Sequence, residues 1–300
     1  MKKLLFIPLG WQSKPNPDLF NAFCKEFETL HYESLVEAIL FDPDFIYVQC
    51  GAISVSDLYE LKKESGAKVV QWTGDCRAEL MQNVLEFKDI ADLTLLAVGI
   101  GQKEMYEKAL NHRVGYLQQG VFNSFFLPVK TEFETGSVVF IGNNYDHFEG
   151  ALERTELCEV LSECFEYFEV IGNGFNSPEF SNTRSVPYID SAEIYNNAYI
   201  SISHACFNEI EGYYSNRTLD IMAAGGCCLM RRVPNCEELF VDMKHVVYYR
   251  DSEEAVDKII MLFSNPEIRN SVSLAGQNLV KKFHTFDYRV KEIKSALEKI

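Results

Sequence analysis

Short apolar runs alternate with amphipathic segments along the first 120 residues of the chain. The apolar runs have the length of buried strands, and the segments between them repeat apolar residues with the period of a helix. The expected strands are Leu4–Leu9, Phe45–Gln49, Val69–Thr73, Leu93–Val98 and Val114–Gln118. The expected helices are Asp18–Leu30, His31–Leu40, Ser56–Ser65, Glu79–Phe87 and Gln102–Leu110. This alternation with short connections predicts a parallel sheet covered on both faces.

The alternation stops at residues 122–136, which contain Pro128 and charges without a period, and it then restarts. The later strands are expected at Val138–Ile141, Phe168–Ile171, Ala198–Ala205, Cys227–Met230 and Val246–Tyr249. Helices are expected at Ala151–Phe165, Ser191–Asn197, from Arg217 onward, and at Ser252–Phe263, Pro266–Lys282 and Phe286–Ile300. We therefore predict two parallel α/β domains, residues 1–130 and 131–285, followed by a last helix over residues 286–300.

The segment of residues 201–232 carries the strongest chemical signal. It is a strand, a polar loop, a short helix and a second strand, and Ser215 or Asn216 is placed to cap the helix. Free N–H groups, the helix dipole and Arg217 together attract a phosphate. Asp220 follows one turn later on the same face and could accept a sugar diol. The predicted phosphate and sugar ligands in this segment are Ser215, Asn216, Arg217, Thr218 and Asp220.

Composition and charge narrow the class of partner. The 300 residues are 47% apolar, as in an ordinary globular protein, and 28 basic against 44 acidic residues give a net charge of −16. This acidic balance makes duplex nucleic acid an improbable partner, although a local basic cleft stays open. The nine cysteines are scattered without a Cys-x-x-Cys pair, which favours reduced thiols and a cytoplasmic location.

The apolar segments also bear on membrane contact. Residues 1–9 (MKKLLFIPL) resemble the start of a signal peptide, but the apolar run is short and no small-residue cleavage site follows. We interpret them as the first buried strand. Because no apolar stretch has the length of a bilayer span, no stable membrane insertion is expected.

Several motifs resemble a known family, the CgeB-like glycosyltransferases, which are related to the family-four group of retaining GT-B enzymes. In the second half the matching segments are VVFIGNN (138–144), VIGNGF (170–175), YNNAYISIS (195–203), SNRTLDIMAAGGCCLM (215–230), CEELF (236–240) and FHTFDYR (283–289). In the first half KVVQWTGD (68–75) and VGYLQQGV (114–121) match more loosely. The resemblance implies a GT-B fold, two Rossmann-like parallel-sheet domains facing across a cleft.

The same resemblance implies a division of labour. The C-terminal domain would hold a nucleotide-diphosphate sugar, the N-terminal domain would hold the acceptor, and the last helix would pack back on the N-terminal domain. It also implies retention of configuration and no obligate metal. The co-substrate would be a nucleotide sugar, with a UDP-sugar favoured, and no other cofactor is expected.

Residues outside the segment 201–232 complete the predicted donor site. Arg154 and Arg217 are the candidate cations for the leaving diphosphate, although Arg154 could equally form surface pairs. Asn143 follows the first strand of the second domain, where the family often has a cation. Tyr188 could border the base or merely pack at the rim. Gly10 would let the backbone approach the diphosphate.

Two residues are candidates for catalysis. Asp75 ends an expected strand and could orient or deprotonate an acceptor hydroxyl, but it could also be a turn aspartate. His204 ends the strand opposite the donor helix, although a lone histidine is more often structural. The family's two-glutamate motif is not intact, because Gly212 stands eight residues before Asp220.

We therefore predict a metal-independent glycosyltransferase that moves a hexose from a nucleotide sugar to an acceptor hydroxyl. The acceptor stays open between a glycan, a protein, a small molecule and a modified nucleobase. One alternative is a nucleotide-sugar epimerase on the same fold, which would need a paired acid and base. A second alternative is a degenerate module that binds a glycan or a partner, and the broken glutamate motif favours it.

Overall fold

Two compact units make up the chain. The computed structural model describes residues 1–9, 17–74, 77, 79–97, 99–133, 135–175, 177–180 and 183–300. Unit 1 comprises Met1–Phe122 together with Thr285–Ile300, and unit 2 comprises Asn123–His284. The start of the expected linker groups with unit 2, where the carbonyl of Leu127 accepts a hydrogen bond from Gln277 Nε2 at 2.6 Å.

Unit 1 is built on a six-stranded parallel sheet in the order β2-β1-β3-β4-β5-β6. Its strands are β1 (Lys3–Ile7), β2 (Glu28–His31), β3 (Phe45–Gln49), β4 (Lys68–Thr73), β5 (Leu93–Leu96) and β6 (Arg113–Tyr116). The five strands expected from apolar runs are confirmed. The sequence predicted helix at the residues that form strand β2, and this prediction is wrong. The strand reads ETLH and lies half-exposed at the sheet edge, so it lacks the apolar run that marks the buried strands.

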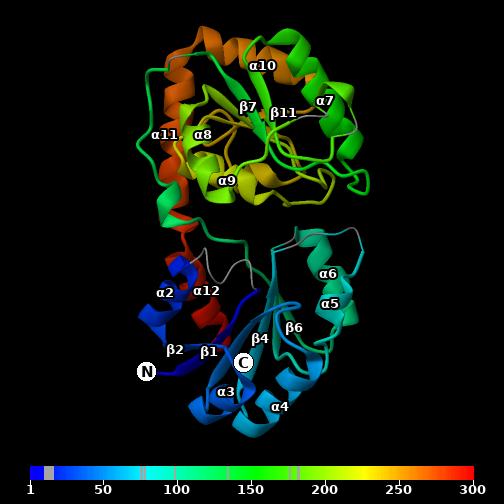
Figure 1. Ribbon diagram of the computed structural model, residues 1–300, viewed down its shortest axis with the longest axis vertical. Helices are drawn as coiled ribbons and strands as arrows, with labels where there is room; N and C mark the ends of the chain where they lie inside the picture. Colours follow the sequence, from blue (N-terminus) through cyan, green and yellow to red (C-terminus); the bar gives the residue numbers. More distant parts are fainter. Residues whose placement is uncertain are drawn as a thin grey trace. The chain divides into compact units, whose positions relative to one another are not determined.

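Helices cover both faces of this sheet. They are α2 (Pro17–Glu26), α3 (Leu35–Phe41), α4 (Val55–Ser65), α5 (Gln82–Leu85), α6 (Ile100–Ala109) and α12 (Phe286–Leu297). Helices α3 and α4 begin where Ser34 and Ser54 accept a backbone N–H of the first turn. The last helix, α12, lies beside α2 (Figure 1). Its Val290 and Ile293 pack in one core with Phe23.

Unit 2 has a five-stranded parallel sheet in the order β11-β10-β9-β7-β8. Its strands are β7 (Val138–Ile141), β8 (Phe168–Ile171), β9 (Ile200–Ser203), β10 (Cys228–Arg231) and β11 (Val247–Tyr249). Its helices are α7 (Ala151–Cys164), α8 (Ser191–Asn197), α9 (Asn216–Ala223), α10 (Ser252–Ser264) and α11 (Pro266–Phe283). Short 3-10 turns are η1 (Asn123–Phe125), η2 (Pro178–Phe180), η3 (Tyr188–Asp190) and η4 (Cys236–Glu238).

The strand order of unit 2 reverses at β7. The chain passes from β7 to β8 on one side and then returns to β9 on the other side. In open parallel sheets such a switch point leaves a crevice at the carboxyl ends of the strands, where ligands bind. The topology therefore directs attention to the ends of β7 and β9.

Five of the eight described cysteines are buried and pack as small apolar residues. All eight in the described ranges are free thiols: Cys24, Cys50, Cys158, Cys164, Cys206, Cys227, Cys228 and Cys236. Burial raises the pKa of the Cys158 and Cys227 thiols to about 12, which keeps them protonated. In the same ranges, no helix combines the length and apolarity that a bilayer span requires.

Candidate functional site

A cavity of about 370 Å³ opens at the switch point of unit 2. This volume lies in the range of small-molecule sites. Its walls are the ends of β7 and β8, the segment from η3 into α8, and the amino end of α9. The lining residues are Ile141, Gly142, Asn143, Ile171, Gly172, Ser185, Val186, Tyr188, Ser191, Tyr195, Ser215, Asn216, Arg217 and Asp220. Six of the predicted donor-site residues are therefore brought together here: Asn143, Tyr188, Ser215, Asn216, Arg217 and Asp220.

The amino end of α9 faces this cavity. Ser215 is the N-cap, with extended backbone angles, but its side chain caps no N–H group. Its Oγ atom is buried and has no hydrogen-bond partner among the described residues. The first N–H groups of a helix have no partner within the helix. The helix end therefore offers donors and a positive dipole to whatever occupies the cavity.

Thr218 does not take part in the way that the sequence predicts. It is fully buried, and its hydroxyl shares a hydrogen bond of 2.7 Å with the Ser203 hydroxyl in β9. Its N–H donates to the carbonyl of Ser215 at 3.0 Å. Thr218 therefore anchors α9 to the sheet, and its predicted ligand role is corrected to a structural one.

Arg217 lies flat across the end of β7. Its Nε donates to the Ile141 carbonyl, and its Nη1 donates to the His204 carbonyl at 2.8 Å. The guanidinium carbon lies 4.7 Å from the centroid of the Phe140 ring. The side chain of Arg217 therefore extends from the start of α9 to the end of β7, and its charge lies in the wall of the cavity.

Arg154 supports this charge from behind. It is 1% exposed and does not line the cavity. Its Nη1 donates to the Asn143 carbonyl at 2.6 Å and its Nη2 to the His204 carbonyl at 2.8 Å. Burial and the nearby Arg217 lower the pKa of Arg154. Within the described ranges neither arginine forms a salt bridge with a carboxylate. Arg217 lies in the cavity wall with the buried Arg154 behind it, and the carboxyl group that interacts with Arg217 is that of Asp220.

Asp220 is the buried acid of the site. It is 2% exposed, and its Oδ2 accepts a hydrogen bond from the Tyr188 hydroxyl at 2.8 Å. Its Oδ1 has no partner among the described residues, and the same holds for Asn216 Oδ1. Burial raises the pKa of Asp220 to about 7, against the lowering effect of the Tyr188 hydrogen bond and of Arg217. These unsatisfied oxygens are suited to accept hydrogen bonds from ligand hydroxyls.

The ring of His204 does not reach the cavity. It is fully buried, its Nδ1 lies 2.9 Å from the Ala205 carbonyl oxygen, and its Nε2 lies 3.6 Å from Glu153 Oε1. Burial lowers its pKa. The predicted catalytic role of this ring is therefore corrected. What His204 supplies is its carbonyl, which accepts hydrogen bonds from both Arg154 and Arg217.

Two other predicted residues, Gly10 and Asp75, lie outside the described residues. The sequence also missed the other eight residues of the cavity wall, Ile141, Gly142, Ile171, Gly172, Ser185, Val186, Ser191 and Tyr195. Gly142 sits directly under Arg217, and an added Cβ would lie 2.1 Å from Arg217 Nη2. A glycine that directly follows a buried strand is the signal that could have pointed to this close approach.

The neighbouring glycines provide a matched prediction. In Gly142→Ala the new Cβ meets the end of a flexible side chain, so the fold should persist while Arg217 is displaced. We expect UDP affinity to fall about tenfold, as for a lost hydrogen bond to a charged group. In Gly172→Ala the backbone has φ of +144° and the Cβ would meet the Gly142 carbonyl oxygen at 2.1 Å. This variant should lose about 2 kcal/mol or more of stability.

Calorimetry and thermal unfolding check both variants. The double variant Gly142→Ala/Arg217→Ala is the control, since it should bind UDP no worse than Arg217→Ala alone. An additive loss in the double variant would contradict the view that Gly142 acts through Arg217.

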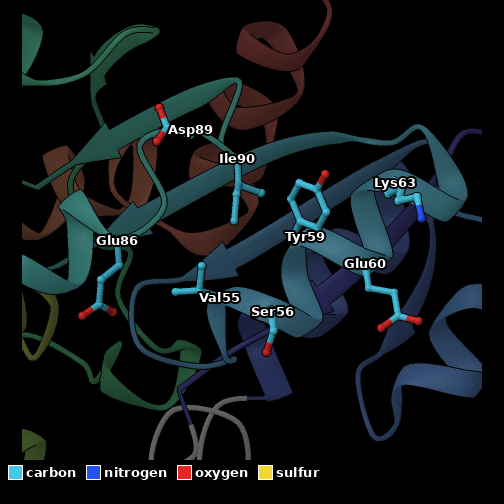
Figure 2. Close-up of a pocket in the computed structure, with 8 residues that line it drawn as sticks. All are labelled: Val55, Ser56, Tyr59, Glu60, Lys63, Glu86, Asp89 and Ile90. Carbon is cyan, nitrogen blue, oxygen red and sulfur yellow. The ribbon is translucent and has the colours of Figure 1, made fainter.

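A second cavity lies in unit 1 and has different chemistry. It measures about 800 Å³ and is lined by α4 on one side and by residues 86–90 on the other (Figure 2). Its charged side chains are Glu60, Glu86 and Asp89 against Lys63. Because carboxylates outnumber cations, this cavity is unsuited to a phosphate. Among the described residues, no group of three or more His, Cys, Asp or Glu is placed to hold a metal ion.

Solved structures of three other proteins share the fold of this chain. Sucrose-phosphate synthase from Thermosynechococcus elongatus has a TM-score of 0.66 at 10% identity, over 100% of this chain and 99% of its own. HepE from Anabaena, in complex with UDP and glucose, has a TM-score of 0.67 at 10% identity over 100% of both chains. The β-glucosyltransferase of phage T4 has a TM-score of 0.66 at 12% identity, over 98% of this chain and 99% of its own. The chain thus has the fold of GT-B glycosyltransferases.

Sequence comparison locates the family in the part that contains the cavity. None of the curated proteins matches the chain. The model of the glycosyl transferase-like family matches residues 142–295, which is just over half of the chain. This range begins at Gly142, at the wall of the cavity, and contains α9 with Arg217 and Asp220. The chain therefore belongs to the glycosyl transferase-like family.

Proposed function

We propose that the protein is an active glycosyltransferase and that the cavity of unit 2 binds the nucleoside diphosphate of a donor sugar, with UDP favoured. The observation that carries this proposal is the pairing of an unsatisfied buried acid, Asp220, with an arginine and a helix amino end in one cavity. Family membership supports it. So do the structural relatives, since HepE is known in complex with UDP-glucose.

The residues of the cavity suit the two parts of such a ligand. The N–H groups at the start of α9 and Arg217 would hold the diphosphate, and Asp220 would accept a hydrogen bond from the ribose. Transfer breaks the bond between the anomeric carbon and the diphosphate oxygen, which keeps the electron pair. The acceptor oxygen bonds to the anomeric carbon and gives up its proton. Arg217, with Arg154 behind it, would stabilise the charge that develops on the leaving diphosphate.

The finer points of the reaction are part of the same proposal. The acceptor would bind to unit 1, where Asp75 would orient its hydroxyl or take its proton. Configuration would be retained, as the resemblance implies, which requires the acceptor oxygen to attack from the face that the diphosphate leaves. The two arginines would replace a metal, and the protein would act in the cytoplasm. A T4 β-glucosyltransferase structure holds UDP with Mn²⁺. In this chain the two arginines would supply the positive charge instead, so we expect transfer or slow donor hydrolysis to continue in EDTA. Loss of activity that Mn²⁺ restores would contradict metal independence.

A thermal-shift screen of nucleotide sugars, followed by donor turnover, tests the proposal. We expect stabilisation by UDP and UDP-sugars and slow release of the free sugar in the absence of an acceptor. An isomerised nucleotide sugar would instead identify an epimerase. Binding without turnover on any acceptor would identify a glycan- or partner-binding module. The acceptor classes that enter the screen are glycans, proteins, small molecules and modified nucleobases.

A further inference from the structure

Tyr188 links the two partly satisfied acceptors of the cavity. Its hydroxyl donates to Asp220 Oδ2 at 2.8 Å and accepts a hydrogen bond from Asn216 Nδ2 at 3.2 Å. The residue itself is held in place on η3. Its ring centroid lies 5.2 Å from that of Phe125, and its carbonyl accepts a hydrogen bond from the Ser191 hydroxyl at 2.7 Å.

This chain of hydrogen bonds fixes the direction of two oxygens. A carboxylate is planar, so an Oδ2 tied to Tyr188 sets where the Oδ1 of Asp220 points. An amide is planar as well, so an Nδ2 tied to the same hydroxyl sets where the Oδ1 of Asn216 points. Both Oδ1 atoms are buried and have no partner in the described part of the chain. Both residues line the cavity. The Oδ1 atoms of Asp220 and Asn216 are therefore two oriented acceptors, suited to a ligand with two hydrogen-bond donors.

We propose that Tyr188 is a positioning residue of the donor site, whose hydroxyl orients Asp220 and Asn216 to receive the two vicinal hydroxyls of a nucleotide ribose. This inference rests on the proposed function, in which the cavity binds a nucleoside diphosphate. A ribose offers two O–H donors and a 2′-deoxyribose offers one. The arrangement therefore distinguishes ribonucleotides from deoxyribonucleotides, because a missing hydroxyl leaves a buried acceptor unpaired.

The ionisable groups around Asp220 give a second, independent readout. Tyr188 from η3 and Arg217 from α9 act on its carboxyl group, and Asp220 in turn raises the pKa of Tyr195 from α8. The Tyr188 hydrogen bond favours the charged form, which is the better acceptor. Removal of this hydroxyl should raise the pKa of Asp220. The pH above which UDP binds well should then move upward.

Calorimetric titration of the full chain with UDP and with 2′-deoxy-UDP, over pH 5.5 to 8.5, tests the inference. We expect the unmodified protein to prefer UDP by about tenfold. In Tyr188→Phe we expect a loss of about tenfold for UDP, a smaller loss for 2′-deoxy-UDP and an upward shift of the pH midpoint. The control is Tyr199→Phe, which removes a phenol of the same unit whose hydroxyl donates to the Leu262 carbonyl at 3.4 Å. This control should bind like the unmodified protein.

Each other outcome overturns the inference in a recognisable way. If Tyr188→Phe keeps both the UDP affinity and the preference for ribose, Tyr188 is not a positioning residue, while the proposed function stands. An equal loss for both nucleotides with an unchanged pH midpoint would reduce its role to packing. If the unmodified protein binds neither nucleotide, the proposed function and the inference fall together.

Discussion

Replacement of Arg217 by alanine is expected to abolish the rise in melting temperature that we predict for the unmodified protein with UDP. The guanidinium is held by two backbone carbonyls and by the Phe140 ring, so it is already ordered before a ligand enters. In the described ranges the guanidinium forms no salt bridge with a carboxylate, and a bound diphosphate would supply an anionic partner. Truncation of one member of a buried charge pair typically costs about 2 to 5 kcal/mol, which corresponds to a loss of affinity between about 30-fold and about 5,000-fold.

Two further variants make this result specific. Arg217→Lys keeps the charge but lacks the planar fork, so it should recover only part of the affinity. Arg231→Ala removes a cation of the same unit that pairs with Glu153 and does not line the cavity. It should leave the UDP-induced shift intact. An unchanged shift in Arg217→Ala would refute the role assigned to this arginine.

Asp220→Asn should make the free protein more stable at pH 8 and at the same time weaken UDP binding. The pKa of Asp220 is about 7 in the folded state, against about 3.9 in an unfolded chain. The folded state therefore binds the proton more tightly, and the stability that Asp220 contributes is present below pH 4 and lost as the pH rises through 7. An uncharged Asn escapes this loss. We expect a gain of about 2 to 4 kcal/mol at pH 8 and little difference at pH 4.

Although it stabilises the free protein at pH 8, Asp220→Asn should weaken UDP binding. Asn keeps one acceptor oxygen but removes the negative charge that would receive a ribose hydroxyl, so affinity should fall about tenfold or more. Urea unfolding at pH 4 and pH 8, together with UDP titration at pH 8, measures both. Asp287→Asn, at an exposed pair with Lys25, serves as the control and should change neither quantity. Equal stability of Asp220→Asn and the unmodified protein at both pH values would contradict the buried position of this carboxyl.

The elements of the fold follow closely from the sequence pattern where burial is complete. Strands such as β3 and β7 have buried side chains on both faces, so they show as apolar runs. The sequence pattern did not predict strand β2, because an edge strand of four residues can be polar and half-exposed. Similarly, the segment near Leu127 is tied to unit 2 by long-range hydrogen bonds, from Gln277 to the Leu127 carbonyl and from Asn196 to the Pro128 carbonyl, which no local pattern reveals.

The candidate site was predictable where it is built from residues that are close together in the sequence. The helix cap at Ser215, the arginine and the acid one turn later are local features, and the structure brings them to one cavity. What the sequence could not provide is the direction of long side chains. Arg217 turns back over Gly142, and the ring of His204 turns into the core. The partnership of Tyr188 with Asp220 spans 32 positions and arises only when η3 packs against α9.

A crystal structure of the full chain with UDP is the direct test of the proposed donor site. We expect the diphosphate at the amino end of α9, with its oxygens in hydrogen-bond reach of the N–H groups of Asn216 and Arg217. We expect the ribose hydroxyls against Asp220 Oδ1 and Asn216 Oδ1. UDP bound elsewhere on the chain, or a cavity that stays empty at saturating UDP, would contradict this proposal.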